Sequence, residues 1–144
     1  MTDPASGDQA FLAGDNRQNW HEMTYGGALS FARRRYSRAL DGVDVVVSGI
    51  PYDGAVTYRS GCRLGPRAIR AGSTQLAELA HFPFGFDPFD HLAVIDFGDC
   101  YLDPHHPQGV FRAIEAHADL IVGAGAKMLS FGGDHSVSYP LLKA

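Results

Sequence analysis

Three short apolar runs alternate with segments of helical character, and this alternation restricts the chain to an α/β fold. We predict strands at residues 43–50, 92–97 and 127–131. The first is β-branched or apolar at nearly every position, and the third also has the character of a buried strand, as in a parallel sheet. Residues 67–79 and 109–123 lie between the runs and carry apolar residues at roughly helical spacing. Strands joined by helices form right-handed crossovers in a parallel sheet.

We therefore predict a three-layer α/β/α fold with a parallel sheet, of which this chain is the incomplete N-terminal half. Residues 137–142 resemble the start of a further helix. Two full crossovers do not cover both faces of a three-stranded sheet, so apolar surface and a strand edge should remain open. Residues 1–40 are expected to be an N-terminal arm and lead-in segment, and residues 41–144 the first half of the α/β domain.

Composition and charge narrow the function classes. The hydrophobic content of 45% and charged content of 19% are ordinary for a soluble globular protein. A net charge of −4 argues against nucleic acid or an anionic membrane as partner. No apolar run approaches the ~20 residues that span a bilayer, and the first residues do not resemble a secretory signal. Cys62 and Cys100 form no paired motif, and the expected location is the cytoplasm.

The turn after the third predicted strand carries the strongest candidate site. Two glycines are followed by Asp134, His135 and Ser136. Polar side chains delivered at the carboxyl end of a buried strand are typical of α/β active sites, and a rigid turn suits a metal-binding imidazole. The alternative is a capping turn in which Asp134 or Ser136 caps the next helix and His135 has no role.

Other polar residues have simpler interpretations. Asp96 and Asp99 at the end of the second strand are expected to cap turns and pair with arginine rather than bind metal. Adjacent His105 and His106 do not face one metal from one regular element, so a surface loop is favoured. The arginines at positions 33–38 indicate a solvated face or interface ion pairs. In the helix at residues 109–123, Glu115 and His117 should lie on the polar side.

Two motifs resemble those of the ureohydrolases, the arginase and agmatinase family, and within it the agmatinases. Phe-Gly-Gly-Asp-His-Ser at residues 131–136 is similar to the first metal-binding motif. Residues 59–66 fit the pattern Arg-x-Gly-x-Arg-x-Gly-Pro, although many relatives carry proline or alanine where this chain has Ser60. The resemblance covers residues 25–142 and implies that His135 is a ligand of one of two bridged manganese ions. Asp134 and Ser136 would then orient or cap, and the loop at residues 53–63 would form part of the pocket wall.

The resemblance implies an agmatinase-type hydrolase that releases urea and an amine, putrescine from agmatine, with two Mn²⁺ ions activating a water. Arginine, guanidinobutyrate and formiminoglutamate are alternative substrates. Relatives are commonly homo-oligomers. The family's later metal motifs, Asp-Ala-His-x-Asp and Ser-x-Asp-x-Asp-x-x-Asp-Pro, do not occur in these 144 residues. We therefore expect this chain to be inactive alone. The alternative from another class is a short, non-catalytic interaction module.

Overall fold

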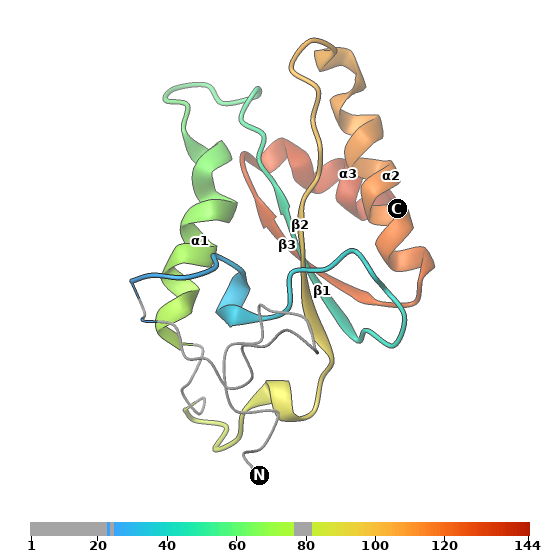
Figure 1. Ribbon diagram of the computed structural model, residues 1–144. Helices are drawn as coiled ribbons and strands as arrows, with labels where there is room; N and C mark the ends of the chain where they lie inside the picture. The colour runs from blue at the N-terminus through green and yellow to red at the C-terminus, as the bar shows by residue number, and fades with distance from the viewer. Residues whose placement is uncertain (1–22, 24, 77–81) are drawn as a thin grey trace.

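The computed structural model describes residues 23, 25–76 and 82–144. Within them, strands and helices alternate along the chain (Figure 1). The strands are β1 (Val45–Ile50), β2 (Val94–Asp99) and β3 (Lys127–Gly132), and the α-helices are α1 (Gly65–Ser73), α2 (Val110–Gly123) and α3 (Ser138–Lys143). Of the expected arm and lead-in segment at residues 1–40, residues 1–22 and 24 lie outside the described part of the chain.

The three strands form one parallel sheet in the order β2-β1-β3. Helix α1 lies on one face of this sheet, and α2 and α3 lie on the other (Figure 1). Helix α1 links β1 to β2, and α2 links β2 to β3. These two crossovers run in opposite directions across the sheet, so right-handed connections place their helices on opposite faces. This arrangement confirms the predicted three-layer α/β/α fold with a parallel sheet.

Helix α1 is shorter than the sequence pattern indicated. It begins at Gly65, with Pro66 in the first turn, where the missing N–H has no partner to lose. It ends at Ser73, whose Oγ donates a hydrogen bond of 2.7 Å to the carbonyl of Arg70. Such side-chain bonds to the preceding turn compete with continued helix. A 3₁₀ helix at Thr74–Leu76 follows, and residues 77–79 lie outside the described part of the chain.

Two strand predictions are corrected by the sheet. Strand β2 does not stop at Gly98 but continues to Asp99, because a bulge at Phe97 lets Gly98 and Asp99 stay paired with β1. Strand β3 is not buried as predicted, since Leu129 is 44% exposed. A short apolar run has the same composition in a central and in an edge strand, so its burial depends on neighbours that the run does not reveal.

The apolar core lies between the sheet and α2. One cluster of buried side chains is Val46, Ile95, Phe97, Ile121 and Ala126, and a second is Ile50, Cys100, Val110, Ile114 and Val137. The α1 side is different, because the buried side chains there include Arg70, Ser73 and Asp96. The two faces of the sheet are thus covered by different chemistry.

The segment before β1 packs along the outer edge of β2. Arg35 and Ser37 exchange backbone hydrogen bonds with Asp96, at 2.9 and 3.0 Å. A 3₁₀ turn, Phe31–Arg33, precedes this pairing. Arg33 was predicted to lie on a solvated face or in interface ion pairs, but it is buried, with 5% exposure. Its Nη2 donates hydrogen bonds to the carbonyls of Met23 and Gly26.

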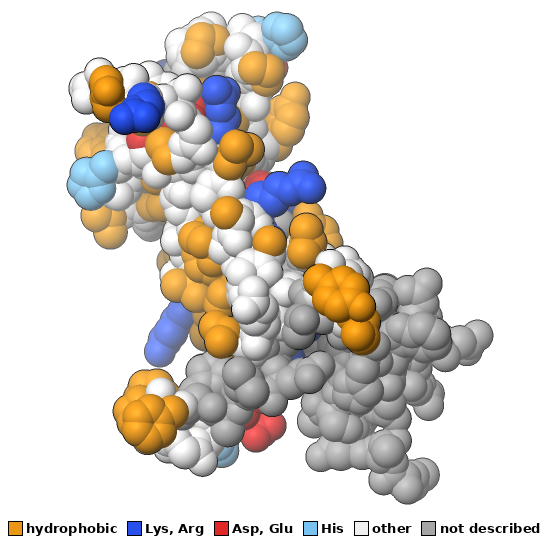
Figure 2. All heavy atoms as spheres, turned by 90° about the vertical axis from the view of Figure 1, so that its left-hand side faces the viewer, with side chains coloured by type: hydrophobic (Ala, Val, Ile, Leu, Met, Phe, Trp, Pro, Cys, Tyr) orange, Lys and Arg blue, Asp and Glu red, His pale blue; other side chains and the backbone are white. Residues whose placement is uncertain are grey.

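The face that carries α1 shows hydrophobic side chains with Lys and Arg between them (Figure 2). Ile69 and Leu76 contribute exposed apolar surface from this helix and the turn that follows it. Across the described residues, none of the helices has the length and apolar character that crossing a membrane requires.

Candidate functional site at the carboxyl edge of the sheet

All three parallel strands end at one edge of the sheet, which lies at the top in Figure 1. Residues 51–61 follow β1, residues 100–106 follow β2, and residues 133–137 follow β3. In α/β folds, ligands bind outside the carboxyl ends of the strands because side chains from several loops converge there. The candidate site is therefore built from these three connections.

His135 is the first residue of a 3₁₀ turn, His135–Val137, directly after β3. Its side chain is exposed at the carboxyl edge, so it does not lie among aliphatic side chains. The turn is held from below, because Val137 is 3% exposed and packs in the second core cluster. The structure thus presents an accessible imidazole on a fixed turn.

Asp134 caps this turn, as one of the two sequence interpretations proposed. Its Oδ1 accepts hydrogen bonds from the N–H and the hydroxyl of Ser136, at 2.9 and 2.5 Å. Its Oδ2 accepts the N–H of Ala55 at 2.8 Å. Burial alone would raise the pKa of Asp134, but these hydrogen bonds and the nearby His135 outweigh it and lower the pKa. Both carboxylate oxygens are occupied by protein donors.

Asp53 shapes the loop at residues 51–61. Its carboxylate is 8% exposed and accepts the N–H of Gly61 at 2.6 Å. The Nε of Arg63 lies 3.4 Å from the other carboxylate oxygen. The sequence placed this loop in the pocket wall but did not predict the role of its acid. The available signal was an aspartate at the start of a loop containing glycine and hydroxyl residues, whose N–H groups it can bind.

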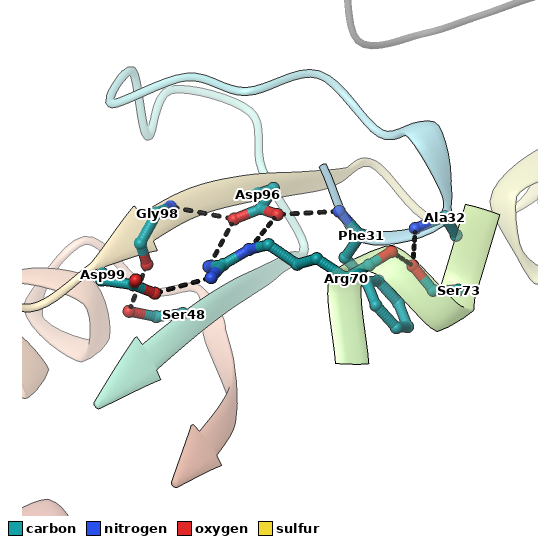
Figure 3. A network of polar contacts seen from close by, with 8 residues as sticks. All are labelled: Phe31, Ala32, Ser48, Arg70, Ser73, Asp96, Gly98 and Asp99. Atoms are coloured by element: carbon teal, nitrogen blue, oxygen red, sulfur yellow. Dashed lines mark hydrogen bonds and ion pairs between the residues drawn. The ribbon is translucent and has the colours of Figure 1, made fainter. Parts of the chain in front are cut away.

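Asp96 and Asp99 both bind Arg70, as the sequence analysis proposed (Figure 3). Asp96 accepts from Nε at 2.7 Å and from Nη2 at 2.9 Å. Asp99 accepts from Nη1 at 2.6 Å. Burial alone would lower the pKa of Arg70, but the two carboxylates raise it. With its oxygens used in this way, Asp96 has a structural role beneath the site.

Three of the other described histidines, His105, His106 and His117, do not lie on the turn after β3. His105 and His106 are exposed in the loop after β2, as predicted, and His106 pairs with Asp103 at 2.8 Å. His117 was predicted on the polar side of its helix, but it faces the sheet. Its Nε2 lies 2.6 Å from the Oγ of Ser48, and burial together with Arg38 lowers its pKa.

Comparison with known proteins agrees with the motifs and the fold. The family model described as the arginase family matches residues 43–144. The chain belongs to the arginase family. An agmatinase of Chromobacterium violaceum is 63% identical over 123 residues, and an agmatinase of Cronobacter sakazakii is 47% identical over 100 residues. These matches cover 85% and 69% of this chain, but 38% and 33% of the relatives. The chain thus spans well under half of their length.

Solved structures show the same arginase-family fold. A hypothetical agmatinase from Burkholderia thailandensis has a TM-score of 0.88 and 57% identity, over 96% of this chain and 44% of that one. The proclavaminate amidino hydrolase of Streptomyces clavuligerus has a TM-score of 0.74 and 32% identity, over 85% and 40%. These matches confirm the predicted arginase-like architecture and show that the described sheet corresponds to part of the larger chains.

His135 is the candidate metal donor that the described part of this arginase-family chain presents on the turn after β3. Among residues 23, 25–76 and 82–144, no group of three or more His, Cys, Asp or Glu side chains is arranged to hold an ion. His135 fits the role of a single ligand because it is exposed on a fixed turn. Asp134 does not add a second, since its oxygens are already bonded. A bridged pair of ions needs more donors than this.

Proposed function

We propose that this chain carries part of the active site of an agmatinase-type ureohydrolase. Such an enzyme hydrolyses the guanidinium group of agmatine to urea and putrescine and depends on manganese. The observation that carries the proposal is the exposed imidazole of His135 on a turn fixed at the carboxyl edge. The 63% identity to a protein named agmatinase supports the choice of substrate.

Each part of the carboxyl edge has a task in this proposal. His135 holds one manganese ion, and a bound metal pair supplies an activated water. Asp134 and Ser136 fix the turn that carries the imidazole. The loop at residues 51–61 forms a wall of the substrate pocket. Its exposed Arg59 does not contact the substrate, because two guanidinium cations repel each other at close range.

Other members of the family define the nearest alternatives. The structural relative from Streptomyces clavuligerus is named for a different amidino substrate. Arginine, guanidinobutyrate and formiminoglutamate therefore remain alternative substrates. A non-catalytic interaction module is the alternative from another class, and the exposed Leu129 on β3 is the feature that favours it.

The proposal extends to the state of the protein. We infer that the 144 residues alone are inactive, because the described part has no group of three or more side chains arranged to hold an ion and the relatives are much longer. We also infer a homo-oligomer and a cytoplasmic location for the enzyme. A sizing measurement on the complete protein tests the first of these two inferences.

A chimaera tests the function directly. The segment of the Chromobacterium violaceum agmatinase that matches this chain is replaced by the chain's own 123 residues, and urea release is measured with manganese and with a chelator. We expect manganese-dependent urea release from agmatine, and none from the 144-residue chain alone. Parallel assays with arginine and guanidinobutyrate decide between substrates.

Matched histidine variants of the chimaera test the proposed ligand. Removing groups that merely orient metal ligands costs 10–100-fold, so His135→Ala should lower urea release by at least about 100-fold. His105→Ala is the control, because that side chain is exposed on a neighbouring loop. Unchanged activity in His135→Ala would refute the assignment of the ligand. Comparable urea release by the 144-residue chain would refute the claim that donors are missing.

A further inference from the structure

Two carboxylates at the carboxyl edge of the sheet are buried, although neither belongs to the apolar core. Asp53 is 8% exposed and Asp134 is 9% exposed. A buried carboxylate is costly unless its oxygens accept hydrogen bonds. Both are satisfied, and most of their donors are backbone N–H groups of one loop or of the turn that bears His135. We call residues 52–61 the rim loop.

Asp53 closes the rim loop on itself. The 2.6 Å hydrogen bond from the Gly61 N–H joins two positions eight residues apart, and the Nε of Arg63 lies on the other oxygen. These contacts hold the two ends of the loop together. The closed loop also docks against a neighbouring segment.

Asp134 supplies that docking contact. Its Oδ2 accepts the N–H of Ala55, 79 residues away in sequence. In the opposite direction, the N–H of Asp134 donates to the carbonyl of Tyr52 at 2.7 Å. The loop and the turn thus exchange one bond in each direction. The remaining oxygen of Asp134 is bonded to Ser136, the residue after His135.

Gly133 allows this close approach. A Cβ at position 133 would overlap the carbonyl group of Tyr52. The two backbones meet at van der Waals distance only because that atom is missing. The contact between rim loop and turn is therefore built into the backbone as well as into the carboxylate.

We propose that Asp134 is a positioning residue that fixes the rim loop to the turn bearing His135, so that the two move as one unit. One carboxylate oxygen of Asp134 accepts a hydrogen bond from the rim loop, and the other accepts from the turn. Any shift of the rim loop is then transmitted to the imidazole. Under the proposed function, on which this consequence rests, the substrate wall and one metal ligand are set by the same side chain.

The Asp134→Asn variant of the 144-residue chain tests the coupling without metal or substrate. The amide keeps one accepting oxygen in place of two, so it cannot accept from both Ala55 and Ser136, and it removes the charge that strengthens these hydrogen bonds. We expect amide hydrogen exchange at Ala55 to accelerate by at least about tenfold. The amide of Gly61, held by Asp53, should keep its rate. Asp103→Asn is the control, because the carboxylate of Asp103 is bonded to His105 and His106 in the loop after β2.

The outcomes separate local docking from folding. Faster exchange at Ala55 with unchanged Gly61 supports the proposal. An unchanged Ala55 overturns it. Equal acceleration at both amides, with a lower midpoint of thermal unfolding, also overturns it, since Asp134 would then stabilise the fold rather than the contact.

The chimaera extends the test to metal binding. We expect Asp134→Asn to weaken manganese affinity by about 10–100-fold in a calorimetric titration, as for other residues that orient a ligand, with the thermal midpoint unchanged. Unaltered affinity would overturn the link between rim loop and ligand. If the unmutated chimaera releases no urea, the proposed function fails, while the exchange result at Ala55 still decides the coupling.

Discussion

Arg70 binds two carboxylates that a regular strand would send to opposite faces of the sheet. Asp96 and Asp99 are three positions apart, and side chains alternate along a strand. Between them the register against β1 shifts, and Gly98 has a φ of +79°. The N–H of Gly98 donates to Asp96 at 2.9 Å, which closes the bulge. The extra residue turns both acids toward one guanidinium.

Replacing Arg70 should therefore be severe. Asp96 is fully buried, so Arg70→Met leaves an uncompensated charge in the interior, and removing one partner of such a pair costs about 3–5 kcal/mol. We expect a loss of this size in the free energy of unfolding, measured by urea denaturation. Asp99 contributes less, since its side chain is 40% exposed.

Arg67→Met is the matched control on the same helix. Arg67 is exposed, and exposed substitutions usually change stability by less than about 0.5 kcal/mol. A cost for Arg70→Met as small as that of the control would contradict the structural role of the network.

Sequence reasoning found this pairing but not its geometry. An arginine on a helix and two acids at a strand end are enough to predict an ion pair. The bulge was not predicted, because Gly98 reads equally well as the residue that ends the strand. Arg33 was missed for a different reason. Its guanidinium is satisfied by backbone carbonyls of nearby residues, and carbonyls leave no pattern in a sequence.

At the scale of elements, helix α2 is joined to the central strand by a polar contact. His117 lies 2.6 Å from Ser48 on β1, and its ring meets the edge of Phe97 with centroids 5.5 Å apart. The sequence pattern placed His117 outside because it is a polar residue among apolar residues at helical spacing. Ser48 is a polar residue in the middle of an apolar strand. A hydroxyl in that position indicates a polar partner on the helix that covers the sheet.

This contact predicts a dependence of stability on pH. Burial and Arg38 lower the pKa of His117 in the folded chain, while Asp99 acts weakly in the opposite direction. The unfolded chain therefore binds the proton more readily. The stabilisation is complete above the unfolded pKa of about 6.5 and is lost as pH falls through the lower folded value.

Urea denaturation at a series of pH values between 7.5 and about 5 checks this expectation. His117→Gln should remove part of the decline that the unmutated chain shows below about pH 6.5. His105→Ala, an exposed control, should leave the decline unchanged. Identical pH profiles for the unmutated chain and His117→Gln would disprove the role of His117.

The positions of the strands could be predicted from the apolar runs in the sequence. All three were located to within a few residues, because short apolar runs between turn residues indicate strands. Their order and exposure were not predicted in detail. The candidate turn at His135 was located for the same reason, whereas its docking to the rim loop joins residues 79 positions apart, a relation that local patterns do not contain.

At the scale of the whole molecule, the sheet has unequal edges. The backbone of residues 35–37 pairs with the outer edge of β2. Among the described strands, none pairs with the outer edge of β3, and Leu129 on that strand is 44% exposed. An open edge with an apolar side chain is a template for pairing with another chain.

The 144-residue chain should therefore self-associate through β3. We expect Leu129→Lys to shift the chain toward monomer in analytical ultracentrifugation, since a lysine on an edge strand opposes pairing. Leu120→Lys is the control, because Leu120 is 57% exposed and lies on helix α2 rather than on an edge strand. Equal association of both variants would show that the edge of β3 is not the contact.

Asp96 has a further consequence for how the chain reaches this state. Its carboxylate accepts hydrogen bonds from Phe31, Arg70 and Gly98, which lie far apart in the sequence. Withdrawing the acid from water is unfavourable until all of them have arrived. The lead-in segment, the first helix and the second strand thus gain little by assembling in pairs, and their docking becomes a single cooperative event.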